Sequence, residues 1–121
     1  MERIPTIRIV LLPRDTNANG TIFGGVILSH IDLAGAVEAR KHTNERIVTV
    51  AMKEVVFKHP VLVGELLSIY TSTTRLGKTS ITVHVEVEVD RQTETVPVTA
   101  ADLTFVCVDQ CGRPVPVKGS R

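Results

Sequence analysis

Aromatic side chains and an excess of either charge are nearly absent from this sequence. It has no tryptophan, one tyrosine and three phenylalanines, and its 14 basic residues are balanced by 13 acidic ones to a formal net charge of +1. A protein that binds nucleic acid without sequence preference needs a basic surface and aromatic rings on which bases can stack. The composition therefore argues against a nucleic-acid partner.

Long hydrophobic runs and cysteine clusters are lacking as well. No uncharged stretch approaches the roughly 18 residues of a membrane span, and the opening MERIPTIRIV contains no signal-peptide core. Cys107 and Cys111 are the only cysteines, too few for a tetrahedral zinc site. These features predict a cytoplasmic protein with reduced thiols, no membrane span and no metal.

Segments rich in Val, Ile and Thr dominate what is present, and they predict β-strands. The segment at 79–90 is the clearest, because apolar residues alternate with polar ones along its whole length and give it one apolar face. The short connections between segments favour antiparallel pairing. The expected strands cover residues 6–12, 47–58, 66–75, 79–90 and 96–108.

One segment, residues 23–41, predicts a helix instead. It is too long for a strand, ends in two basic residues and is apolar almost all round, which favours a buried position. The expected architecture is a single α+β domain over residues 1–121, with one long hydrophobic helix wrapped by a curved antiparallel sheet. Residues 112–121 are expected to form a loose tail.

The loop before this helix, RDTNANGTIFGG at 14–25, carries two signals. From Asp15 onward it matches the first half of a calcium-binding EF-hand loop, but the twelfth position, which must be glutamate, is Val26. Calcium is therefore not expected. Gly24 and Gly25 leave bare backbone N–H groups at the positive end of the helix, where a partly negative oxygen is stabilised.

Asp32 stands in the middle of the apolar helix. A buried, unpaired carboxylate is costly, so this acid needs a reason to be there. Gly35, three residues on, weakens a helix relative to alanine and indicates a closely approaching neighbour. The residues alone leave two interpretations of Asp32 open: a catalytic carboxylate, or an acid bonded to the backbone of another subunit.

Three runs of the sequence resemble the hotdog-fold acyl-CoA thioesterases: LPRDTNANGTIFGGVILSHIDLAG, RIVTVAMKEVVFKHPVLVGE and TRLGKTSITVHVEVEV. The resemblance covers residues 9–109 and is to small bacterial acyl-CoA thioester hydrolases and the cytosolic long-chain enzymes of animals. It implies a hotdog fold with a five-stranded antiparallel sheet, active sites shared at a dimer interface, and homohexamers built as trimers of dimers. It also implies hydrolysis of acyl-CoA to fatty acid and CoA, with no cofactor besides the CoA of the substrate.

By motif position, the resemblance implies that Asn17 and Asp32 form the catalytic pair and that Thr49 faces the site from the sheet. The chemistry is compatible, because a thioester releases a thiol whose pKa is only about 8.5. A carboxylate that activates water or attacks directly suffices if donors at Gly24 and Gly25 hold the carbonyl oxygen.

The nucleotide end of CoA needs cations and hydroxyls. The run RLGKTS is a tight turn with two cations and is suited to phosphate oxygens, although a hairpin turn with solvated charges has the same composition. In the resembling family this region lines the CoA groove. The expected CoA-binding residues are Arg75, Gly77, Lys78, Thr79 and Ser80, with Lys58 and His59 as second candidates.

Two other functions remain compatible with the sequence. A non-catalytic hotdog module could sense acyl-CoA, but it would not need Asp32. A hotdog dehydratase would need a histidine paired with a carboxylate, and no histidine occupies the helix position of Asp32. Release of free CoA from acyl-CoA distinguishes hydrolysis from both.

Overall fold

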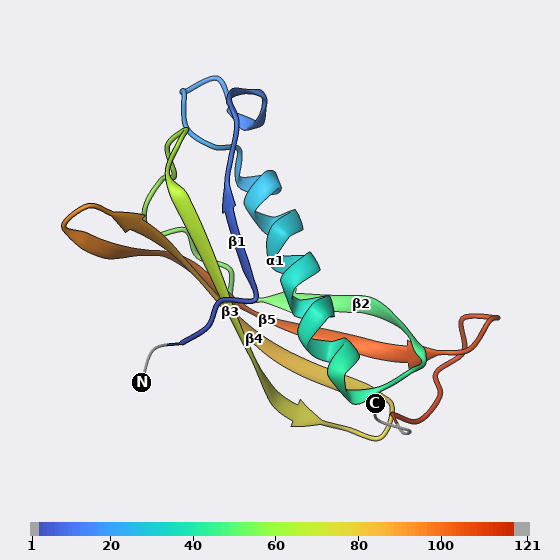
Figure 1. Cartoon of the computed structure of the whole chain (residues 1–121). Helices are drawn as coiled ribbons and strands as arrows, with labels where there is room; N and C mark the ends of the chain where they lie inside the picture. Colours follow the sequence, from blue (N-terminus) through green and yellow to red (C-terminus); the bar gives the residue numbers. More distant parts are fainter. Residues whose placement is uncertain (1–2, 118–121) are drawn as a thin grey trace.

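The computed structural model describes residues 3–117, which form one curved sheet with a helix across it (Figure 1). The sheet has five strands in the order β1-β3-β4-β5-β2, and every neighbouring pair is antiparallel. The elements are β1 (Ile7–Val10), η1 (Pro13–Asp15), α1 (Gly24–Ala39), η2 (Arg40–His42), β2 (Arg46–Lys53), β3 (Leu66–Leu76), β4 (Ser80–Arg91) and β5 (Glu94–Val108). This confirms the predicted α+β hotdog architecture. Within the described residues, no helix is long and apolar enough to cross a membrane.

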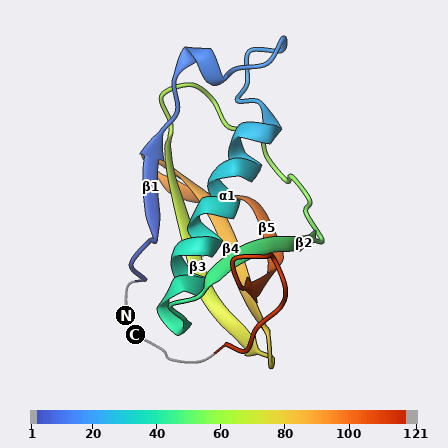
Figure 2. The ribbon, with the colours of Figure 1, turned by 90° about the vertical axis from the view of Figure 1, so that its right-hand side faces the viewer.

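The core lies between α1 and the face of the sheet that α1 covers, here called the inner face. Figure 2 shows α1 lying across the strands. The apolar positions of β4 are all buried on the inner face, as their alternation predicts, and Ile27 and Ile31 of α1 pack in the same core. The close neighbour expected at Gly35 is β5: a Cβ added there would lie 3.1 Å from the Phe105 ring.

The end of α1 is fixed to β3 by a buried carboxylate. Glu38, only 9% exposed, accepts hydrogen bonds from Thr71 (3.1 Å) and Thr73 (2.8 Å) and forms an ion pair with Lys41 (3.0 Å). Burial raises the pKa of Glu38, but the bonds from Thr73, Lys41 and Thr71 outweigh it, so the pKa is below its usual value. The charged form therefore ties α1 to the inner face.

The expectation of a helix buried all round is wrong for the single chain. Leu33 and Val37 are 57% and 48% exposed. One sheet can cover only one side of a helix, so the apolar residues on the opposite side of α1 stay open until another surface covers them.

Several element boundaries differ from those predicted. β1 is shorter than 6–12, and β2 ends at Lys53 instead of continuing to residue 58, because Glu54 adopts a positive φ of 60° that a strand cannot contain. The apolar residues that follow are held by single bonds to β5: Thr99 donates to the carbonyl of Val56 at 2.7 Å, and the N–H of Lys58 donates to Val98 at 2.7 Å.

The expected loose tail is attached to the sheet through Val117. The N–H of Val115 donates to the carbonyl of Cys107, and that of Val117 donates to Lys78, each at 2.8 Å. Both valines pack against the core. Their apolar side chains explain why this segment returns to the sheet, and residues 118–121 lie outside the described part of the chain.

Candidate active site

Asp32 and Thr49, which the resemblance assigned to one site, are in contact. Thr49 donates a hydrogen bond to Oδ1 of Asp32 at 2.7 Å. Thr49 pairs across the strands with Phe105, a core residue, so both lie on the inner face of the sheet toward α1. Asp32 is half-buried, and its second carboxylate oxygen is not used by Thr49. A hydroxyl thus orients a carboxylate that still has an oxygen available to act on a ligand.

The N-terminus of α1 is open, as its two glycines suggested. Phe23 precedes the helix in an extended conformation without a side-chain cap, and the first N–H groups of a helix have no partner within it. A Cβ added to Gly25 would lie 2.7 Å from the Phe23 ring. The missing side chain of Gly25 therefore leaves room for the Phe23 ring beside the first turn of the helix.

A cavity of about 260 Å³ adjoins this helix end. Gly24 lines it together with Lys58 and His59, and its apolar wall includes Ile27 and Phe57. The structure thus brings together three of the residues that were predicted separately as donor and CoA-binding candidates. A cation beside an apolar wall at a helix N-terminus suits a ligand that is both apolar and negatively polarised.

Asn17 organises the loop that precedes the helix. Its Oδ1 accepts from the N–H groups of Asn19 (2.8 Å) and Thr21 (3.2 Å), and its Nδ2 donates to the hydroxyl of Thr21 (3.0 Å). The amide has two N–H donors, and within residues 3–117 only this one is engaged. The remaining donor is the group that Asn17 can offer to a ligand.

Within one chain, the helix N-terminus and the carboxylate cannot act on the same carbonyl group. Asp32 is eight positions beyond Gly24, and at a rise of about 1.5 Å per residue it lies about 12 Å further along the helix. A carbonyl bond is only about 1.2 Å long. The two predicted halves of the site are therefore separate in the single chain.

The predicted CoA-binding turn lies at the other end of the molecule from the Asn17 loop (Figure 1). It is a tight turn closed by the N–H of Gly77, which donates to the carbonyl of Ser80 at 2.8 Å. Lys78 and Thr79 form its tip, where their carbonyl oxygens accept from Val117 and Cys107. Arg75 is not at the tip but lies within β3.

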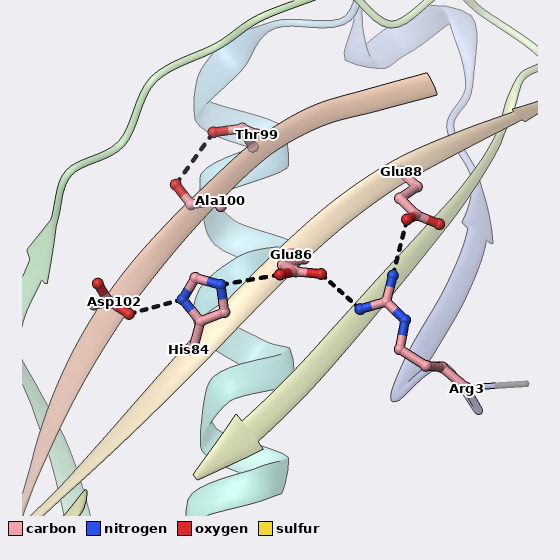
Figure 3. Close-up of polar contacts among 7 residues, drawn as sticks. All are labelled: Arg3, His84, Glu86, Glu88, Thr99, Ala100 and Asp102. Carbon is pink, nitrogen blue, oxygen red and sulfur yellow. Dashed lines mark hydrogen bonds and ion pairs between the residues drawn. The ribbon is translucent and has the colours of Figure 1, made fainter. Parts of the chain in front are cut away.

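A charged network covers the sheet face turned away from α1, here called the outer face (Figure 3). Arg3 pairs with Glu86 (2.6 Å) and Glu88 (2.8 Å), while Nδ1 of His84 meets Asp102 at 2.8 Å and its Nε2 meets Glu86 at 3.2 Å. The alternation in β4 could have placed His84, Glu86 and Glu88 together. The sequence alone could not have predicted that Asp102 belongs to this network, because only the β4–β5 register brings it opposite His84.

This network predicts a pH-dependent stability. The bond to Asp102 raises the pKa of His84, with Glu86 assisting and burial opposing. The stabilisation is therefore fully present below the unfolded-state pKa of about 6.5 and is lost as pH rises through the higher folded-state pKa. Urea unfolding of the wild type and of His84→Gln should differ more at pH 6 than at pH 8. An equal or larger difference at pH 8 would contradict the assignment.

Comparison with known proteins gives the family of this chain. The family model of the Thioesterase superfamily matches residues 19–96. The acyl-CoA thioester hydrolase YciA of Salmonella typhimurium is 38% identical, over 93% of this chain and 90% of that protein. A hexameric hotdog fold thioesterase of Campylobacter jejuni is 45% identical, with a TM-score of 0.87 over 94% of this chain and 90% of that one.

A further similar structure has been solved with CoA compounds bound. The acyl-CoA hydrolase of Staphylococcus aureus, studied in complex with butyryl coenzyme A, coenzyme A and coenzyme A disulfide, is 30% identical. Its TM-score is 0.85, over 93% of this chain and 70% of that one. On the strength of the matched fold and the identity along nearly its whole length, this chain belongs to the thioesterase superfamily.

Proposed function

We propose that this protein hydrolyses acyl-CoA thioesters to a free carboxylic acid and CoA. The observation that supports this most directly is the Asp32 carboxylate, held by Thr49 at 2.7 Å in the middle of an apolar helix. Its relatives point to the same activity, since the Salmonella protein is an acyl-CoA thioester hydrolase and the Staphylococcus protein is an acyl-CoA hydrolase. No separate cofactor is proposed, because CoA enters as part of the substrate.

Asp32 supplies the reactive group in this proposal. Its charged carboxylate either takes a proton from a water that adds to the thioester carbon, or attacks that carbon itself to form an anhydride that water then hydrolyses. Both routes require the ionised form. The bond from Thr49 leaves the other oxygen free and fixes its direction. The CoA thiolate then departs without strong acid assistance, because a thiol has a pKa of only about 8.5.

The carbonyl oxygen is stabilised by a second protomer. Because about 12 Å of helix separates Gly24 from Asp32 in one chain, we place Asp32 of one protomer against Asn17, Gly24 and Gly25 of the partner subunit. The exposed apolar side of α1, with Leu33 and Val37, and the open edge of β2 provide the surface for such an assembly. The protein is thus a homo-oligomer with shared sites, and the hexameric Campylobacter relative suggests a trimer of dimers.

The polar part of the substrate is assigned to two regions. Lys58 and His59 line the cavity beside Gly24, which supports a role for them at the pantetheine arm. The cations and hydroxyls of the β3–β4 turn are available to the phosphates: Arg75, Gly77, Lys78, Thr79 and Ser80. We also propose a cytoplasmic location, supported by the two unpaired thiols, Cys107 and Cys111.

A shared site predicts complementation between two inactive variants. Asn17→Ala and Asp32→Asn should each lose most activity alone. Co-expressed in equal amounts, they should recover about a quarter of the wild-type sites, because in a two-fold dimer only mixed pairs form one intact site. The measurement is CoA release, followed with a thiol-reactive dye on purified mixed oligomers.

The matched control is the double variant Asn17→Ala/Asp32→Asn, co-expressed with the wild type. In this mixture intact sites form only where two wild-type chains pair with each other. Activity of the mixed single variants that does not exceed the sum of their separate activities would contradict a shared site. Wild-type protein that binds acyl-CoA without releasing CoA would contradict the proposed function itself.

A further inference from the structure

The outer face of the sheet, on the side away from Asp32, contains a depression that includes two of the predicted CoA-binding residues, Arg75 and Ser80. Its volume is about 590 Å³, and side chains from four strands line it. They come from β2, β3, β4 and β5, and all are charged or hydroxyl-bearing: Lys53, Thr74, Arg75, Ser80, Thr82, Asp102 and Thr104. Two cations from strands that are not neighbours therefore meet at one place.

A β-bulge turns Arg75 to the outer face. Thr73 faces α1, since its hydroxyl bonds Glu38 at 2.8 Å. Strict alternation would place Arg75, two positions on, on this same inner side. The register shift between Thr73 and Arg75 inserts Thr74 and sets Arg75 opposite Thr82, whose side chain lines the outer depression.

A second bulge does the same for Lys53. Thr49 faces α1 through its bond to Asp32, and alternation would place Lys53, four positions on, on the same side. The register shift between Thr49 and Ala51 reverses the alternation, so Lys53 lies opposite Asp102 on the outer face. Two independent bulges thus direct two cations into one depression.

The charges there are not balanced by the protein. Among the described residues, neither Lys53 nor Arg75 forms an ion pair, and the one carboxylate in the lining, Asp102, is bonded to His84 at 2.8 Å. Two like charges that share a depression repel each other unless an anion lies between them. The lining contains no aromatic ring that could stack on a base. Its four hydroxyls can donate to anionic oxygens: Thr74, Ser80, Thr82 and Thr104.

We propose that this depression binds a ligand that carries at least two phosphoryl groups, with Arg75 as a forked donor and Lys53 as a point charge. The depression recognises the phosphoryl groups of the ligand and not a nucleotide base. The ligand chemistry has two possible sources: the 3′-phosphate and diphosphate of CoA, or a free phosphorylated effector. The first source rests on the proposed acyl-CoA hydrolysis, and the second does not.

Calorimetric titration of the intact oligomer with inorganic pyrophosphate, dephospho-CoA and CoA tests the site. The double variant Lys53→Ala/Arg75→Ala should weaken pyrophosphate binding at least about tenfold, because each cation supplies charge-assisted hydrogen bonds. Binding should also weaken as salt is added, since the site is open to solvent. CoA should bind the wild type more tightly than dephospho-CoA if its 3′-phosphate occupies the site.

The matched control is Arg8→Ala. Arg8 is also on the outer face, opposite Ser68, but it is paired with Asp90 at 3.7 Å and lies away from the depression. Arg8→Ala removes one positive charge from the same face, against two in the double variant, and should leave pyrophosphate affinity within about twofold. Unchanged pyrophosphate affinity in the double variant, or equal losses in the double variant and the control, would overturn the proposal.

Kinetics then identify the source of the ligand. If the double variant raises KM for acyl-CoA but not for the matching acyl-pantetheine, with kcat unchanged, the bound phosphates are those of the substrate. If pyrophosphate binding is lost and both KM values are unchanged, the site takes a free phosphorylated effector, and the assignment of Arg75 to the CoA phosphates is wrong. Wild-type protein that hydrolyses neither thioester would refute the proposed function without affecting the pyrophosphate result.

Discussion

Replacing Asp32 by asparagine is expected to lower kcat for acyl-CoA by at least about 100-fold, the lower range for loss of a general base. An amide has nearly the same shape as a carboxylate and can still accept the hydrogen bond from Thr49, now 2.7 Å. The fold and the assembly should therefore persist, while the negative charge needed to activate water or to attack is gone. Circular dichroism and light scattering check the first statement, and CoA release at saturating substrate checks the second.

Thr49→Val is the companion variant. It removes the hydroxyl that orients Asp32 but keeps the carboxylate, so kcat should fall less than in Asp32→Asn and KM should change little. Near wild-type turnover by a well-folded Asp32→Asn oligomer would remove this carboxylate from the mechanism. A larger loss in Thr49→Val than in Asp32→Asn would assign the chemistry to the hydroxyl instead.

Gly35→Leu is expected to lower the free energy of unfolding by about 2 to 3 kcal/mol, a typical cost of overpacking a core. Even the first added carbon would lie 3.1 Å from the Phe105 ring and 3.2 Å from the Leu103 side chain. The remaining carbons have to push α1 away from β5. Since Asp32 is on the same helix and Thr49 is on the sheet, activity should fall together with stability. Urea unfolding and kcat measure the two effects.

Gly35→Ala is the graded control. Its close contact with Phe105 opposes the gain of about 1 kcal/mol that alanine brings to a helix interior, so its net effect on stability should be small. A leucine variant as stable as the wild type would show that α1 can move off the sheet at little cost. That result would also weaken the argument that the α1–β5 packing fixes the position of Asp32.

The sequence by itself determined the elements and their apolar faces. Alternation predicted which side chains of β4 are buried, and the length and apolar character of residues 23–41 predicted α1. Gly35 indicated a closely approaching neighbour, which is β5. These are local properties, set by the side-chain periods of strand and helix and by the missing Cβ of glycine. The resemblance, not the periodicity, paired Asp32 with Thr49, and the structure then placed them in hydrogen-bond contact.

Only the tertiary structure decided which residues from different strands meet. Alternation would have placed Arg75 and Lys53 on the inner face, and two bulges move both to the outer one. The partner of His84 also depends on register, because a shift of one residue would turn Asp102 to the opposite face. The open side of α1 arises because one chain supplies only one sheet. Gly24 and Asp32 are separate because both lie on one rigid helix, about 12 Å apart along its axis.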